Sequence, residues 1–310
     1  MKKILSLLAA ALLAALPFQT VRAAVPDPAA ASRETRDYQL RGFDGLDISW
    51  TFKVELTRGS RYSVRVEAPD FIFPYLKVEV KGGVLTLGTR ELPKDIRRKI
   101  EALSRSGEIH ASVTMPELCS LEMSGAAQLN TRDEFLHRND KFRMRLSGAA
   151  SAHGLSVKAI DADIDGSGAA KFDLKGEFDR VDLRMSGAAN GKLESSPKVV
   201  EANLSGAAKL DWTGRLGKTG ILASGSANLG IEGAAAELNV NGSGAAKVRA
   251  GQAASRTAEV RLSGAASCEL DVRESLSVNL SGASSCRYHG TDALRVTTQS
   301  VSRGASLTRY

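Results

Sequence analysis

Hydrophobic and polar residues alternate along most of the chain after residue 37. The alternation is strict from residue 46 to residue 56, where every second side chain is apolar and each one between is polar or charged. A period of two residues is typical of a β-strand with one buried face and one exposed face. Further along, the short phrase Ser-Gly-Ala interrupts the alternation again and again. The sequence therefore predicts an all-β protein with an internal repeat.

The repeat has a nearly constant length. The serines that open the phrase, which ends in serine instead of alanine in one copy, follow one another after 23, 20, 19, 19, 19, 19, 20 and 18 residues. Regular spacing of this kind indicates a solenoid, in which each period forms one coil. The predicted structural corners are Ser124 and Gly125, Ser147 and Gly148, Ser167 and Gly168, Ser186 and Gly187, Ser205 and Gly206, Ser224 and Gly225, Ser243 and Gly244, Ser263 and Gly264, and Ser281 and Gly282.

Aligning the periods on their serines separates inward from outward positions. Positions five, three and one before the serine, and five and seven after it, are mostly apolar, whereas those between are mostly polar. About 19 residues leave no room for a crossover helix, so successive coils must stack as parallel strands about 4.8 Å apart. The spacing thus predicts a parallel β-solenoid in which each coil runs strand, tight corner, strand, turn.

Small residues at the corner are expected for structural reasons. Glycine permits a backbone bend that a Cβ would obstruct, and the serine hydroxyl can satisfy corner carbonyls. The alanine after each glycine is expected to fill the inside of the bend. The members of this column are Ala126, Ala149, Ala169, Ala188, Ala207, Ala245, Ala265 and Ala283. A nucleophile elbow would read Gly-x-Ser-x-Gly, which this phrase does not, and catalysis does not need nine copies.

The chain divides into four predicted parts. Residues 1–23 read as a secretory signal peptide, with two lysines, an apolar stretch and a small-x-small cleavage site. Residues 24–37 form a linker, 38–115 an N-terminal β region leading into the solenoid, and 116–310 the repeat solenoid. Within the β region, Glu91 to Ser104 carries a run of basic residues and predicts a short helix or a surface loop. This segment either contacts an acidic partner or is simply an exposed surface segment without a binding role.

Composition narrows the class of protein. The 310 residues are 43% hydrophobic and only 5% aromatic, with 29 glycines, which suits a thin core. The net charge of +7 is not concentrated in basic runs interleaved with aromatic residues, so a nucleic-acid partner is not expected. No apolar run after the signal is long enough for a transmembrane segment. We expect an exported protein, in the periplasm or at the cell surface.

Few residues are arranged as ligands or catalysts. Cys268 and Cys286 both lie five positions after a corner serine, so they should stack on adjacent coils as two buried thiols or a disulfide. Asp163, Asp182 and Glu201 form an outward acidic ladder that either binds a cation or is neutralised by nearby arginines. The four histidines are scattered without ligand spacing: His110, His137, His153 and His289. No metal site, cofactor or catalytic residue is predicted.

Several of these stretches resemble a known family. They are the segment Gly42–Leu46, the turn at Glu55–Gly59, the segment Met115–Leu118 and the serial Ser-Gly-Ala corners. Together they are similar to the bacterial family called "putative auto-transporter adhesin, head GIN domain", over about residues 38–307. The resemblance implies an exported, single-stranded, right-handed parallel β-helix without catalytic residues. Two features depart from the family: the long segment Glu91 to Ser104, and a last corner, Arg303 to Ser306, that is offset from the register.

Two functions fit these observations. The first is a non-catalytic binding or adhesion module of the bacterial cell envelope, whose repeated polar ladders are presented to a glycan or protein partner. The second is a carbohydrate-active enzyme similar to polysaccharide lyases, an analogy that rests on the β-helix scaffold alone. An enzyme would need long loops to wall a cleft. Because the coils are nearly uniform in length, the sequence favours binding.

Overall fold

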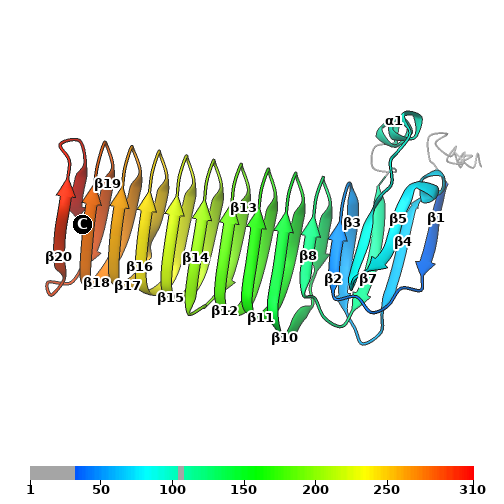
Figure 1. The fold of residues 1–310 in the computed structure, drawn as a ribbon, viewed down its shortest axis with the longest axis horizontal. Coiled ribbons are helices and arrows are strands. Elements are labelled where there is room, and N and C mark those ends of the chain that lie inside the picture. The colour runs from blue at the N-terminus through cyan, green and yellow to red at the C-terminus, as the bar shows by residue number, and fades with distance from the viewer. Residues whose placement is uncertain (1–31, 104–107) are drawn as a thin grey trace, which may run out of the picture. The chain divides into compact units, whose positions relative to one another are not determined.

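The computed structural model describes residues 32–103 and 108–310 and is a β-solenoid of about ten coils (Figure 1). The coils follow one another along a single axis, and the strands of each coil run beside those of the next. A mixed region with one α-helix lies at the N-terminal end. The predicted β-solenoid with a repeat of about 19 residues is therefore confirmed.

The repeat region consists of fourteen strands. They are β8 (Ser120–Met123), β9 (Gln128–Thr131), β10 (Glu134–Leu146), β11 (Ser151–Gly166), β12 (Lys171–Met185), β13 (Asn190–Ser195), β14 (Val199–Leu204), β15 (Lys209–Ala223), β16 (Asn228–Gly242), β17 (Lys247–Leu262), β18 (Ser267–Leu280), β19 (Ser285–Gly290), β20 (Arg295–Val301) and β21 (Ser306–Arg309). Neighbouring coils pair in parallel throughout this region; β15 and β16, for example, pair continuously from Lys209 with Asn228 to Ala223 with Gly242, apart from Gly217. Equivalent residues of successive periods therefore stack directly.

The far side of the coil differs from the prediction. Most of the longer strands run from one Ser-Gly corner to the next without leaving the sheet; β12, for instance, spans 15 residues. The separate turn expected in each coil is thus replaced by a bend inside a continuous strand. Among the described coils, breaks remain there at residues 132–133, 196–198 and 291–294. A parallel ladder tolerates this bend because the neighbouring coils bend at the same place.

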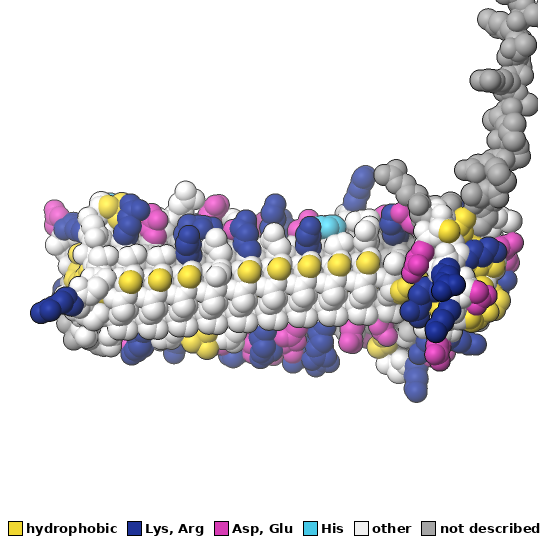
Figure 2. Space-filling view, turned by 90° about the horizontal axis from the view of Figure 1, so that it is seen from above, with side chains coloured by type: hydrophobic (Ala, Val, Ile, Leu, Met, Phe, Trp, Pro, Cys, Tyr) yellow, Lys and Arg dark blue, Asp and Glu magenta, His cyan; other side chains and the backbone are white. Residues whose placement is uncertain are grey.

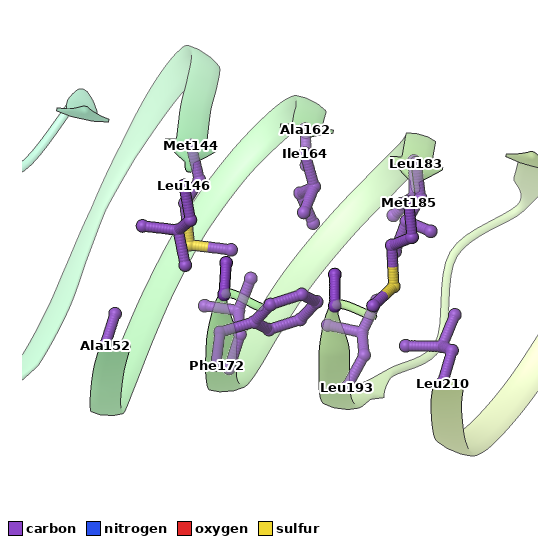
Figure 3. Packing of buried hydrophobic residues seen from close by; sticks show 14 of the residues in the cluster. Met144, Leu146, Ala152, Ala162, Ile164, Phe172, Leu183, Met185, Leu193 and Leu210 are labelled. Atoms are coloured by element: carbon purple, nitrogen blue, oxygen red, sulfur yellow. The ribbon is translucent and has the colours of Figure 1, made fainter. Parts of the chain in front are cut away.

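Two facing walls enclose the core. Met144, Leu146, Ile164 and Leu183 extend inward from the strand segments before the corner, and Phe172 extends from the segment after it (Figure 3). All of these side chains are buried.

Small residues in one coil accommodate large ones in the next. Gly191 stacks directly on Phe172, and a Cβ at Gly191 would overlap the phenyl ring. The inward column therefore varies in size from coil to coil without leaving a gap.

The N-terminal region mixes parallel and antiparallel pairing. Its elements are β1 (Arg33–Tyr38), β2 (Gly45–Ile48), β3 (Phe52–Arg58), β4 (Ser63–Pro69), the 3-10 helix η1 (Asp70–Tyr75), β5 (Leu76–Lys81), β6 (Val84–Thr89), α1 (Lys94–Ala102) and β7 (Ile109–Met115). Strand β4 is antiparallel to β1 and β7, and β5 is antiparallel to β6. In contrast, β2 and β3 pair in parallel with β8 and β9. The solenoid ladder therefore starts at β2, well before the predicted boundary at residue 116.

Two other predictions can be compared with these elements. The basic segment after Glu91 contains helix α1, while its last residue, Ser104, lies outside the described residues. Residues 33–37, assigned to the linker by sequence, instead belong to β1 and pair with β4. The predicted signal peptide, residues 1–23, also lies outside the described part. Within that part, no helix has the length and apolar character needed to cross a membrane.

Candidate binding surface along the corners

Each repeated corner depends on glycine for two reasons. The nine corner glycines from Gly125 to Gly282 have φ between 68° and 72°, the left-handed region that disfavours residues with a Cβ. Their backbones also lie against the preceding coil. A Cβ on Gly206 would come within 2.9 Å of the carbonyl oxygen of Gly187. Any other residue would therefore be strained in its own backbone and would also press on its neighbour.

Backbone hydrogen bonds continue through the corner. The amide of Ala207 donates to the carbonyl of Gly187 at 2.7 Å, and the amide of Ser205 donates to that of Met185 at 2.9 Å. The serine hydroxyls add little, because Ser147, Ser167 and Ser281 reach carbonyls of the preceding coil only at 3.3–3.5 Å. The corner is held by its backbone.

The two alanines of the corner face opposite ways, and this corrects one prediction. The first alanine, exemplified by Ala207, is exposed, whereas the second, Ala208, is fully buried. The left-handed glycine reverses the alternation, so the residue that fills the inside of the bend comes one position later than predicted. The buried column is Ala127, Ala150, Ala170, Ala189, Ala208, Ala227, Ala246 and Ala266.

Seen from above, the corners form a pale strip along the solenoid that is free of charged side chains (Figure 2). A row of small, evenly spaced hydrophobic side chains runs along it, with one gap. Charged side chains border the strip on both sides. The corners thus present a smooth ridge between two charged margins.

One margin contains a groove of about 800 Å³ that runs beside the corner serines. It crosses seven successive coils, because its floor and rim include the residue two positions before each serine. These residues are Asp165, Arg184, Asn203, Leu222, Asn241, Arg261 and Asn279. Leu222 is unusual among them, since 54% of this apolar residue is exposed. The groove combines hydrogen-bonding, charged and apolar contacts in one line.

Two carboxylates of the acidic ladder next to this groove, Asp163 and Asp182, pair with basic residues of the same or a neighbouring coil. Arg184 lies 3.0 Å from Asp182, 3.5 Å from Asp165 and 3.2 Å from Asp163. On the other side, Lys141 lies 3.6 Å from Asp163. These carboxylates raise the pKa of the Arg184 guanidinium, Asp182 contributing most. The described residues contain no group of three or more potential metal ligands. The observed ion pairs are those expected for the arginine interpretation.

The three cysteines are all free thiols in the structure. Cys268 and Cys286 are directly paired in register between β18 and β19, and both are buried. Burial raises the pKa of the Cys286 thiol to about 12 and that of Cys268 well above its usual range. A disulfide between them stays a prediction for an oxidising compartment. Alkylation of the unfolded protein without reductant, followed by mass spectrometry, would test it.

The described histidines lie apart, each beside one carboxylate. His153 is 3.2 Å from Asp173, and His289 is 3.1 Å from Asp271. His110 is 3.3 Å from Glu108, while the side chain of His137 lies outside the described part. The arrangement matches the scattered spacing in the sequence.

One corner was missed by sequence reasoning. Because Ile48 pairs with Met123, Ser49, Trp50 and Thr51 occupy the places of Ser124, Gly125 and Ala126. Trp50 has a φ of 67° and is the one non-glycine among the described residues with positive φ. The signal that could have found it was the serine, which is kept at this corner while the glycine is not.

A second cavity adjoins this first corner and is comparable in volume to the groove. It lies between α1 and the corner and is lined by Trp50, Leu92 and Ile100 together with charged side chains. Lys53 and Glu108 form an ion pair of 2.6 Å at its edge. Lys99 of α1 lies over the ring of Phe71 at 4.0 Å, which fixes the helix to the N-terminal region.

The chain is similar to one protein family and to several solved structures. A family model described as "putative auto-transporter adhesin, head GIN domain" matches residues 42–211 and 189–291. A crystal structure named as a putative adhesin from Parabacteroides distasonis is 15% identical, covers 91% of this chain and 98% of its own, and has a TM-score of 0.52. Another putative adhesin, from Parabacteroides merdae, is 12% identical over 90% and 96%, with a TM-score of 0.50. No curated protein matches the chain. This chain shares its fold with both crystal structures.

Proposed function

Because the chain belongs to the family "putative auto-transporter adhesin, head GIN domain", we propose that it is an exported, non-catalytic binding module of the bacterial cell envelope. Its partner is a glycan or protein polymer that lies along the groove beside the corner ridge. The periplasm and the cell surface are the compartments that suit such a partner.

The observation that carries the proposal is the groove beside the corner serines. It presents equivalent positions of seven consecutive coils, repeated at about the 4.8 Å spacing of a parallel ladder. A small substrate needs a closed pocket, whereas an extended polymer can contact every coil along a line. Successive coils supply both polar and apolar contacts, from Arg184, Asn203, Leu222 and Asn241. Such a surface gains affinity by summing weak contacts.

The charged residues of the groove support binding rather than hydrolysis. Asp165, its carboxylate, is engaged by Arg145 at 3.4 Å and by Arg184 at 3.5 Å. General acid and base catalysis in glycosidases uses a pair of carboxylates placed across the scissile bond. Among the described residues that line the groove, no second carboxylate faces Asp165. We therefore assign the groove to recognition.

Cosedimentation with an isolated envelope fraction tests the proposal. The combined variant Asn203→Ala, Asn241→Ala, Arg261→Ala and Asn279→Ala should lose at least tenfold in affinity, because several contacts disappear together. A single substitution across the ridge, Lys209→Ala, should change affinity by less than about twofold. Circular dichroism confirms that each variant is folded, since these side chains lie outside the core.

Two results would overturn the proposal. One is a wild-type protein that does not sediment with envelope material. The other is a single outer substitution that abolishes all interaction, together with release of cleaved product, because that behaviour belongs to an enzyme with one reacting centre.

A further inference from the structure

Trp50 occupies a position at which every repeated corner has glycine. Its φ of 67° places a bulky side chain in the left-handed region, at a cost that glycine would avoid. Strained backbone of this kind persists where the surrounding structure imposes it and is often found at binding sites. The identity of this residue therefore calls for an explanation beyond corner formation.

Space explains why a side chain is tolerated at this corner. At the repeated corners a Cβ would run into the preceding coil; on Gly125 it would lie 2.8 Å from the carbonyl oxygen of Trp50. Below Trp50, in contrast, β6 ends at Thr89 and the chain leaves toward α1. No corner glycine lies there, and the half-buried Trp50 side chain lines the cavity beside α1. Tolerance alone does not explain why tryptophan is present.

The cavity beside Trp50 has the features of a small-ligand site. Its volume of about 800 Å³ is within the usual range of such sites. The half-buried indole, the buried side chain of Leu92 and the half-buried side chain of Ile100 provide apolar walls. Arg90, Glu91 and Glu101 provide exposed polar groups around them. A flat aromatic ring next to hydrogen-bonding groups of both kinds suits a ligand with one apolar face and many hydroxyls.

Charge balance selects among ligand classes. The side chains lining the cavity include three cations and three carboxylates, so their formal charges cancel: Lys53, Arg90, Arg97, Glu91, Glu101 and Glu108. A phosphorylated or polyanionic ligand would meet as many repelling as attracting groups. A neutral ligand can use both kinds, accepting hydrogen bonds from the cations and donating hydroxyl hydrogens to the carboxylates.

We propose that the cavity formed by Trp50 and helix α1 binds a neutral saccharide unit, whose C–H face stacks on the indole. This inference rests on the proposed function and makes it more specific: the solenoid binds an extended polymer along its groove, and the Trp50 cavity recognises a sugar at the N-terminal end of the ridge. Tryptophan at this corner thus introduces backbone strain that glycine would avoid, and it provides an aromatic face on which the sugar stacks.

Tryptophan fluorescence is a selective probe of this site. The other tryptophan, Trp212, is only 1% exposed and donates its indole N–H to the carbonyl of Ser195 at 3.2 Å. Acrylamide should therefore quench Trp50 and leave Trp212 unquenched. The variant Trp50→Phe serves as the control, because its remaining emission should be at least threefold less sensitive to acrylamide than that of the wild type.

Binding is measured on an array of neutral and acidic oligosaccharides, followed by fluorescence titration with the best neutral trisaccharide. We expect binding of neutral sugars and protection of Trp50 from acrylamide. Trp50→Gly should lose at least tenfold in affinity while keeping its melting temperature, and Glu101→Ala, on the exposed face of α1, should weaken binding without affecting the fold. The matched control is Lys209→Ala, a surface substitution that lies outside both the cavity and the groove, and its saccharide affinity should stay within twofold of wild type.

Three outcomes overturn the inference: no glycan on the array is bound, Trp50→Gly binds as well as wild type, or Trp50 is shielded in the free protein by another part of the chain. Cosedimentation with envelope material separates these from failure of the proposed function. If wild type sediments with the envelope but ignores every glycan on the array, the groove keeps its role and the saccharide site is wrong.

Discussion

The first corner and the repeated corners have the same backbone and different residues. Ser49-Trp50-Thr51 and Ser205-Gly206-Ala207 both bend through a left-handed residue, with φ of 67° and 69°. What differs is the coil underneath. Gly206 lies on the carbonyl of Gly187, whereas Trp50 has no corner glycine below it. The comparison shows that stacking, more than the bend itself, excludes side chains from the repeated corners.

The last corner extends the comparison. Ser302 occupies the serine place, since Val301 pairs with Leu280, but Arg303 occupies the place of Gly282. Gly304 instead stacks on the carbonyl oxygen of Gly282, where a Cβ would come within 2.8 Å. The serine is therefore kept at both ends of the ridge while the glycine is replaced at both.

The largest effect is expected from a methyl group at a stacked corner. Gly206→Ala combines a left-handed Cβ, which costs about 1–2 kcal/mol, with overpacking that costs about 1–3 kcal/mol. Chemical denaturation should therefore show a loss of about 2–5 kcal/mol. The control is Gly230→Ala, because Gly230 has ordinary φ and its nearest neighbour would be the flexible carboxylate of Asp211 at 3.1 Å. Equal losses in the two variants would show that stacking is not the constraint.

The two alanines of one corner should respond in opposite ways. Ala208→Leu places a larger side chain in the closed interior of the bend and should cost about 1–3 kcal/mol. Ala207→Leu adds the same side chain to the exposed ridge and should change the free energy of unfolding by less than about 0.5 kcal/mol. Thermal unfolding of the pair decides between the two inward directions. A larger loss for Ala207→Leu would restore the original assignment.

Cysteines at the two ends of the molecule should lower the free energy of unfolding as the pH becomes alkaline. The pKa of Cys286 rises to about 12 in the folded protein, because burial disfavours the thiolate, whereas in the unfolded chain it returns to about 9. Above pH 9 the unfolded state holds fewer protons, so this contribution to stability is lost as pH rises toward 12. Between pH 8 and pH 10 the loss is about 1.4 kcal/mol.

Reduced protein in urea at each pH provides the measurement. Cys286→Ala should abolish this part of the pH dependence, and parallel pH profiles for wild type and variant would contradict the assignment. The pKa of Cys119 is also raised to about 12, by burial and by the nearby charge of Asp44. Because Cys119 is only half-buried, its replacement should have a smaller effect than that of Cys286.

Returning glycine to the first corner should change the free energy of unfolding only slightly. Trp50→Gly removes backbone strain of about 1–3 kcal/mol but adds about 0.5–1 kcal/mol of chain entropy and loses the packing of the indole. The net change should lie within about 1 kcal/mol of zero and can be stabilising. Calorimetry of this variant beside Trp50→Ala, which keeps the strain and loses the packing, separates the terms. A loss equal to that of Trp50→Ala would mean that the backbone there is not strained.

The smallest effect is expected in the charged margin of the early coils. Arg184→Ala removes contacts with three carboxylates, yet each exposed pair contributes only about 0.2–1 kcal/mol. The difference from wild type should shrink in 1 M salt, where the screening length falls to about 3 Å. Asn241→Ala, on an uncharged part of the same column, provides the comparison. A salt-independent loss would indicate packing instead of charge.

The repeat by itself determined the β-solenoid, because a period of about 19 residues with alternating apolar positions allows little else. The same columns placed Cys268 beside Cys286 and put arginines beside the acidic ladder, since stacking in parallel register follows directly from spacing. Local chemistry also identified glycine as the residue of the bend. These features recur in successive periods, so aligning the periods is enough to predict them from the sequence.

Only the tertiary structure decided the features that occur once or depend on a neighbouring coil. Which alanine points inward depends on how the left-handed glycine rotates the next residue, and alternation alone placed it one position early. The start of the solenoid at β2 depends on long-range pairing with β8, across the antiparallel strands in between. Trp50 read as one more apolar position of a strand. Its corner and its cavity arise because β6 ends beneath it and α1 packs beside it, and no spacing along the chain records that.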